Sequence, residues 1–166
     1  MKRKDPYPPV IAFAENARAF CSLVEAAPSS DRMGFVKHCL RILPLLISQA
    51  AELPDIGKLR TQQDGIAHES GRAVFENLRI ELGDRDSYQK IFDPWRSEGA
   101  EPIFGSISDD LADTWHDLKL GLLVLDAGSA ANAIAEWRFS FWYHWGCHHA
   151  THVLRPLLGL VLENEE

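Results

Sequence analysis

Residues 129–162 read SAANAIAEWRFSFWYHWGCHHATHVLRPLLGLVL, and this stretch decides the fold. Apolar and aromatic residues recur at steps of three and four, which predicts one long helix from Ser129 to about Leu162 with a bend at Pro156. Four large apolar side chains share one face of this helix: Ile134, Trp137, Phe141 and Trp145. Three more aromatic side chains lie on its other faces: Phe139, Trp142 and Tyr143. A helix that is apolar nearly all round is usually buried, so we expect this aromatic-rich C-terminal helix to be central.

The same periodicity predicts four earlier helices and hardly any strand. The first carries an apolar stripe after Pro8-Pro9, the second is capped by Ser29 or Ser30, the third ends at Gly83, and the fourth runs from a Ser106 cap to Gly128. The first stripe consists of Val10, Phe13, Ala17, Phe20 and Val24. Residues 87–92 read as a short helical stretch and 94–105 as a loop. We therefore expect an all-α bundle of about five main helices in a single domain, residues 1–166, with a short flexible N-terminal segment, 1–7.

The composition is that of an acidic globular protein. The 166 residues include 17 Lys and Arg against 24 Asp and Glu, so the formal net charge is −7. Such a chain lacks the basic face that binds nucleic acid or an anionic membrane surface, so we expect neither partner. No apolar run approaches the roughly 20 residues that span a bilayer. The three cysteines are odd in number and lack CxxC spacing, which favours reduced thiols and a cytoplasmic location.

A histidine stripe is the most informative spacing in the sequence. His144, His148 and His152 follow one another at four-residue steps, so they wind along one side of the predicted helix. Two imidazoles at positions i and i+4 can bind one metal ion, as they do in zinc-binding helices. The pattern therefore indicates a site for a divalent metal such as zinc or iron at His144 and His148. The alternative is a pair of neutral core histidines that are hydrogen-bonded to carboxylates or backbone carbonyls.

Further ligands for such a metal are available on the fourth helix. Asp113 and Asp117 lie with Asp110 within about 60° of arc on that helix. Asp113 and His116 also have the acid-x-x-His spacing that recurs in di-metal helix bundles. We take Asp113 and Asp117 as candidate ligands. The alternative is that acids near the start of a helix only stabilise its positive end.

Three groups of residues together resemble a known family. They are Asp109-Asp110-Leu111-Ala112-Asp113, Glu136-Trp137-Arg138-Phe139-Ser140-Phe141, and His144-Trp145-Gly146 with His148, preceded by Tyr88 and Phe92-Asp93-Pro94. The combination resembles an uncharacterised bacterial family, domain of unknown function 5063, over most of the chain. The resemblance implies a small helical protein, and it brings no known activity, cofactor, partner or catalytic residue.

Two functional hypotheses follow from the sequence. It contains no phosphate-binding GxxxxGK[ST], no GxGxxG and no GxSxG, and it does not decide whether the chain is an enzyme. The first hypothesis is a non-enzymatic cytoplasmic interaction module without a cofactor, which binds a protein partner or a second copy of itself. The second is a metal-binding protein or metal-dependent enzyme that uses His144 and His148 with Asp113 or Asp117.

Overall fold

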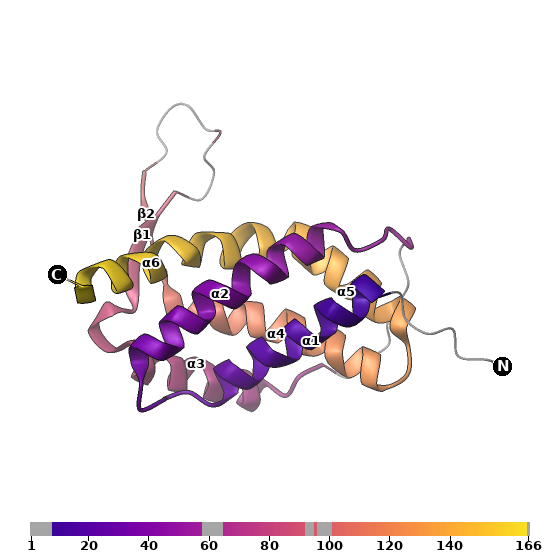
Figure 1. The fold of residues 1–166 in the computed structure, drawn as a ribbon, viewed down its shortest axis with the longest axis horizontal. Coiled ribbons are helices and arrows are strands. Elements are labelled where there is room, and N and C mark those ends of the chain that lie inside the picture. The colour runs from indigo at the N-terminus through magenta and orange to yellow at the C-terminus, as the bar shows by residue number, and fades with distance from the viewer. Residues whose placement is uncertain (1–7, 58–64, 92–94, 96–100, 166) are drawn as a thin grey trace.

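The computed structural model describes residues 8–57, 65–91, 95 and 101–165. The predicted flexible segment, 1–7, lies outside these described residues. Six α-helices, a short two-stranded sheet, one 3₁₀ helix (η1) and one π-helical segment make up the regular structure of the described part (Figure 1). The α-helices are α1 (Pro8–Glu25), α2 (Arg32–Ala51), α3 (His68–Leu82), α4 (Ile107–Asp126), α5 (Ala130–Tyr143) and α6 (Thr151–Glu165). The remaining elements are η1 (Gly83–Arg85), β1 (Ser87–Lys90), β2 (Ile103–Ser106) and the π-helix η2 (Trp145–Ala150).

Helix α4 lies in the middle of the bundle and packs against α1, α3, α5, α6 and η2. Helix α2 packs against both α1 and α6 and completes the core (Figure 1). The predicted stripe of α1 is confirmed, because all five of its side chains are buried: Val10, Phe13, Ala17, Phe20 and Val24. The all-α prediction is therefore correct, and among the described residues no helix is both long and apolar enough to span a membrane.

The structure confirms most of the predicted helix ends. Gly83 and Gly128 follow α3 and α4 with positive φ angles of 60° and 92°, as expected of glycines that end helices. Ser106 caps α4, and its hydroxyl accepts a hydrogen bond from the backbone N–H of Asp109. The cap of α2 differs from the prediction: it is Asp31, whose carboxylate accepts from the N–H of Gly34, and neither of the two serines before it.

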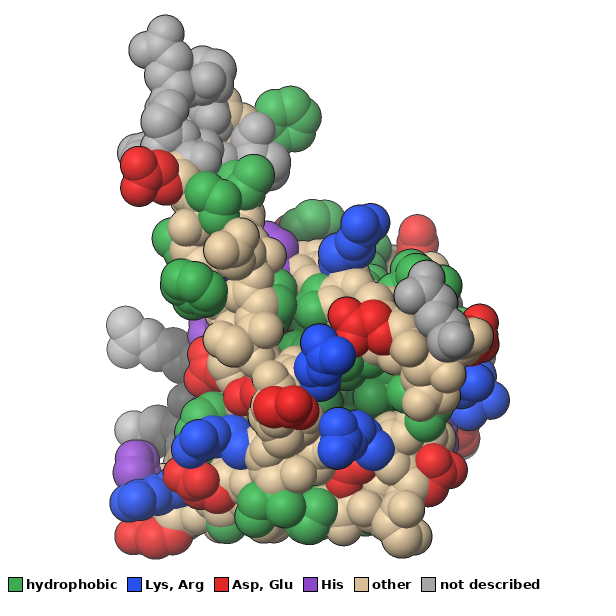
Figure 2. Space-filling view, turned by 90° about the vertical axis from the view of Figure 1, so that its left-hand side faces the viewer, with side chains coloured by type: hydrophobic (Ala, Val, Ile, Leu, Met, Phe, Trp, Pro, Cys, Tyr) green, Lys and Arg blue, Asp and Glu red, His purple; other side chains and the backbone are tan. Residues whose placement is uncertain are grey.

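The stretch between η1 and α4 was predicted wrongly. Residues 87–90 form a strand, β1, that pairs antiparallel with β2, whose residues belong to the predicted loop; residues 92–94 and 96–100 lie outside the described part. Tyr88 pairs with Gly105 and Lys90 with Ile103. The hairpin stands out from the bundle and carries exposed hydrophobic side chains (Figures 1 and 2). Four-residue strands are too short for a periodic signal, and their pairing depends on residues distant in sequence.

The C-terminal segment is interrupted where one continuous helix was expected. Helix α5 ends at Tyr143, His144 leaves the helical region with φ −143° and ψ −91°, and η2 then leads into α6. Gly146 makes this path possible: a Cβ atom on it would lie 2.3 Å from the Phe141 ring. The chain at Gly146 therefore packs directly on Phe141, and the departure from α-helix lies here and not at Pro156.

The aromatic residues of this segment divide between core and surface. Trp137 and Trp145 are fully buried and Phe141 is 7% exposed. The three residues predicted on the other faces are instead exposed: Phe139, Trp142 and Tyr143. The segment thus contributes one face to the core and presents an aromatic face outside.

Candidate metal centre

A buried carboxylate on α4 organises the candidate site. Asp110 has no exposed surface and accepts three hydrogen bonds. Tyr88 Oη and Lys90 Nζ donate from β1, the latter over 3.0 Å, and His149 Nδ1 donates from η2 over 2.8 Å. Burial alone would raise the pKa of Asp110, but these hydrogen bonds outweigh it and hold the pKa below its ordinary value. Asp110 is therefore a buried anion shared by the hairpin and η2.

Two histidines of this segment are each held by a carboxylate of α4. His149 Nδ1 contacts Asp110 Oδ1, and His144 Nδ1 lies 2.7 Å from Asp117 Oδ2. A hydrogen bond from Nδ1–H to a carboxylate fixes the orientation of an imidazole and leaves Nε2 as the nitrogen with a lone pair. Both rings thus have the arrangement that metal-binding histidines have in proteins.

The two rings converge on a third acid, Asp113. Asp113 Oδ2 lies 3.4 Å from His149 Nε2, and the centroids of the His144 and His149 rings are 4.7 Å apart. One possible ligand atom from each of Asp113, His144 and His149 lies within 4.8 Å of the others. Zinc–ligand bonds of about 2.1 Å place neighbouring ligand atoms of a tetrahedral site about 3.4 Å apart. The separation between Asp113 Oδ2 and His149 Nε2 already has that value.

The structure brings three of the four predicted site residues together. Asp113 and His144 belong to the converging group, and Asp117 holds His144 from behind. His148 is outside that group, with its ring centroid 6.5 Å from that of His149. Burial, with the neighbouring histidines, lowers the pKa of His148.

His149 was not foreseen, because the prediction assumed α-helical spacing. In an α-helix residues i and i+4 share a face, which selects His148 as the partner of His144. In η2 the π-helical turn is wider, with i to i+5 hydrogen bonding, so the residue five positions on comes round to the same side. A π-helix leaves no mark in the apolar periodicity, so the sequence pattern alone could not identify His149.

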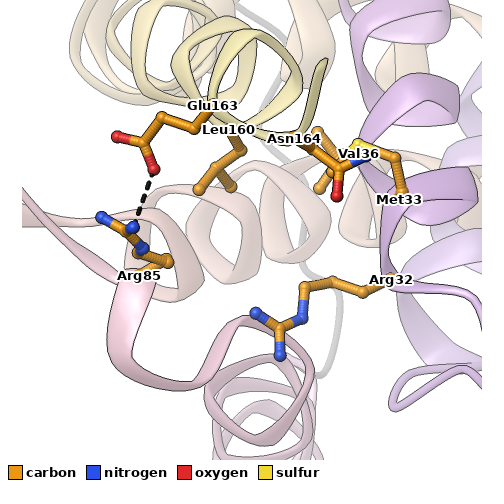
Figure 3. Close-up of a pocket in the computed structure, with 7 residues that line it drawn as sticks. All are labelled: Arg32, Met33, Val36, Arg85, Leu160, Glu163 and Asn164. Carbon is orange, nitrogen blue, oxygen red and sulfur yellow. Dashed lines mark ion pairs between the residues drawn. The ribbon is translucent and has the colours of Figure 1, made fainter. Parts of the chain in front are cut away.

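A separate hollow lies between the start of α2, η1 and the end of α6 and shares no residue with this group (Figure 3). It has a volume of about 290 Å³. Arg85 on one wall is paired with Glu163 over 3.0 Å, and Arg32 faces the same space from α2. Neither histidine nor cysteine is among the residues that line this hollow, so it lacks the imidazole and thiolate ligands that zinc prefers.

Comparison with known proteins agrees with the fold. The chain is similar to the crystal structure of protein BF1032 from Bacteroides fragilis, with 27% sequence identity and a TM-score of 0.78 over 93% of this chain and 96% of that one. A comparison with curated proteins gave no match. The family DUF5063, described as a domain of unknown function, matches residues 5–163. That match takes in both strands of the hairpin, α4 and the histidine segment, and the chain therefore belongs to the DUF5063 family.

Proposed function

We propose that this protein binds one divalent transition-metal ion through Asp113, His144 and His149. The observation that carries the proposal is that two imidazoles, each held at Nδ1 by a carboxylate, have a possible ligand atom within 4.8 Å of a third carboxylate, that of Asp113. Carboxylate–histidine–metal arrangements of this kind orient the ring and raise the basicity of the coordinating nitrogen. An arrangement needed only for packing would not require a third acid beside Nε2.

The local charge also favours a divalent cation. Asp110, Asp113 and Asp117 bring three negative charges to this face, and Lys90 supplies one positive charge. With neutral histidines the cluster carries −2, which one divalent ion would neutralise. This negative charge also affects the nearby Asp109, whose pKa is raised first by burial and then by the charges of Asp113 and Asp110.

The ligand set indicates which metal and what kind of site. Two imidazole nitrogens and one carboxylate suit zinc and iron(II) better than calcium or magnesium, which prefer oxygen ligands. Structural zinc sites are closed by four protein ligands, whereas sites that act on substrates keep positions open. Three protein ligands would leave at least one position for water or a substrate. We therefore favour a metal-dependent enzyme over a structural metal site.

Metal titration of protein purified without a histidine tag tests the proposal. After removal of bound metal with a chelator, calorimetry with Zn²⁺ should give one ion per chain. Asp113→Asn, His144→Gln and His149→Gln should each weaken binding by about tenfold or more, since each removes one of three ligands. The matched control is His152→Gln. His152 is not one of the three proposed ligands, and its Nδ1 donates to the backbone carbonyl of His148.

The outcome that contradicts the proposal is equally definite. If less than one ion binds, or if the three variants bind as tightly as the control while circular dichroism shows them folded, the site does not exist. Elemental analysis of the protein as purified would then find no metal in stoichiometric amount.

A second candidate function is supported by the exposed aromatic face of α5. The Phe139 and Tyr143 rings are 5.0 Å apart, and Trp142 is 51% exposed beside a hollow of about 230 Å³. Contiguous exposed aromatic surface marks sites of protein association. We propose a second copy of the chain as the partner. Sedimentation should then show a dimer that Trp142→Ser dissociates, and a concentration-independent monomer would refute this candidate.

We also propose a cytoplasmic location. The three cysteines are free, with Cys21 and Cys39 buried and Cys147 exposed. A reducing compartment keeps such thiols unpaired. The net charge of −7 supports the expectation that nucleic acid is not a partner.

A further inference from the structure

A groove between α3 and α4 shares Asp113 with the candidate metal centre. Its volume is about 600 Å³, within the range of small-molecule sites. Ile66, Phe75 and Ala112 form apolar walls, and Asp113, the proposed metal ligand, lines the groove from α4. A molecule in the groove would therefore touch a residue that also holds the metal.

The groove contains a cation that is available to a ligand. Arg72, on α3, lines it and is exposed, and within the described part of the chain it forms no ion pair. Among the acids of the groove, Glu76 is paired with Arg79 at 3.6 Å. Arg72 is thus free to bind an anion, and its planar guanidinium suits a carboxylate or a phosphate group.

We propose that this groove binds the ligand of the metal site, a small organic anion with an apolar body. Its carboxylate or phosphate group pairs with Arg72, its body lies against Phe75 and Ile66, and its other end reaches the metal beside Asp113. This inference rests on the proposed metal site, because the open coordination position is what the ligand would occupy. Arg72 then determines specificity and takes no part in holding the metal.

Binding of defined probes to the Co²⁺-loaded protein tests the proposal. The probes are 4-hydroxyphenyl phosphate and 3-(4-hydroxyphenyl)propionate, with 3-(4-hydroxyphenyl)propanamide as the uncharged match of the second. In each probe the phenol oxygen, at the end opposite the anionic group, is the atom that can reach the metal. Calorimetry measures affinity, and the visible absorption of Co²⁺ shows whether a probe alters the metal's coordination. We expect the anions to bind, the amide to bind at least tenfold more weakly, and the Co²⁺ spectrum to change. Whichever anion binds more tightly identifies the anionic group.

Two arginine variants separate the groove from the metal site. Arg72→Gln should weaken anion binding by about tenfold or more while Co²⁺ affinity stays unchanged. Arg41→Gln, an exposed arginine on α2 that does not line the groove, should change neither. Equal binding of anion and amide, an unaffected Arg72→Gln variant, or an unchanged Co²⁺ spectrum at saturation would each overturn the proposal.

Failure of the metal site has a different signature. If the wild-type protein binds no Co²⁺, the proposed function fails, and this inference loses its metal-reaching part. Probe binding to the metal-free protein then tests the groove alone: loss of binding in Arg72→Gln supports an anion site, and absence of binding to the wild type overturns it.

Discussion

Replacing Asp110 by asparagine should destabilise the metal-free fold by about 3 kcal/mol. The carboxylate is fully buried, and it accepts from Tyr88, Lys90 and His149. Hydrogen bonds to a charged group are worth about 1.5–3 kcal/mol each. An asparagine carbonyl in the place of Oδ1 can still accept from Lys90 and His149, although without the negative charge, while the amide group presents hydrogens to Tyr88 Oη where an acceptor is needed. The Lys90 ammonium, only 13% exposed, would lose its anion.

Urea unfolding in the presence of a chelator measures this effect without a contribution from bound metal. With a slope of about 2 kcal/mol per molar urea, the midpoint should fall by about 1.5 M. Because Lys90 is the partner left without its anion, Lys90→Met should cost less stability in the Asp110→Asn background than in the wild type. This double-mutant cycle separates the charge pair from loss of packing.

The control lies on the same helix. Asp126 pairs with Arg18 at the surface, with side-chain exposures of 53% and 48%, so Asp126→Asn should cost less than about 1 kcal/mol. If Asp110→Asn destabilises the protein no more than Asp126→Asn does, or if the Lys90→Met cost is the same in both backgrounds, then Asp110 does not hold the hairpin and η2 as described.

Three substitutions and one labelling experiment test other parts of the structure. Gly121→Ala should destabilise the fold by about 2 kcal/mol or more in urea unfolding, because its Cβ would lie 2.0 Å from Trp137 Nε1. Gly71→Ala, with nothing within 4 Å, should instead stabilise α3 by up to about 1 kcal/mol, and the reverse order would contradict the packing. Ser106→Ala should cost about 1 kcal/mol through loss of the α4 cap, measured the same way, and no loss would show that the cap is dispensable. Iodoacetamide should label only Cys147 in the folded protein, as mass spectrometry would show, because Cys147 is exposed whereas Cys21 and Cys39 are buried; labelling of all three would contradict that burial.

The helical part of the fold could be predicted because its signals are local. The α1 stripe from Val10 to Val24 follows a 3.6-residue period, and burial of that stripe follows directly. The Ser106 cap depends on one side chain and a backbone N–H three residues away. Asp113 and Asp117 were identified for the same reason, since both lie on one regular helix.

The parts that were missed depend on distant contacts. The β1–β2 pairing joins Tyr88 to Gly105, and nothing in either four-residue stretch requires the other. The break at His144 depends on Gly146 packing against Phe141 in a bundle that must already be assembled. His149 was missed because its position depends on that break. Backbone hydrogen-bond register is not encoded in apolar spacing, so periodicity alone selects His148, whereas the structure groups His149 with His144 and Asp113.

The π-helical segment restricts how the chain can change in length. A π-turn is an α-helix with one residue too many, so deleting a single residue between Trp145 and Ala150 would restore ordinary helical hydrogen bonding. Because the wider turn absorbs that extra residue, the helix beyond it would keep its orientation, and Val153 and Leu157, both fully buried in α6, would stay in the core. Deleting Cys147, for example, would put His149 four residues after His144, which in an α-helix is the spacing of a shared face. A single deletion inside the regular part of α6 would instead rotate every later residue by about 100°. Loss of one residue is therefore tolerated better in η2 than in the regular helices.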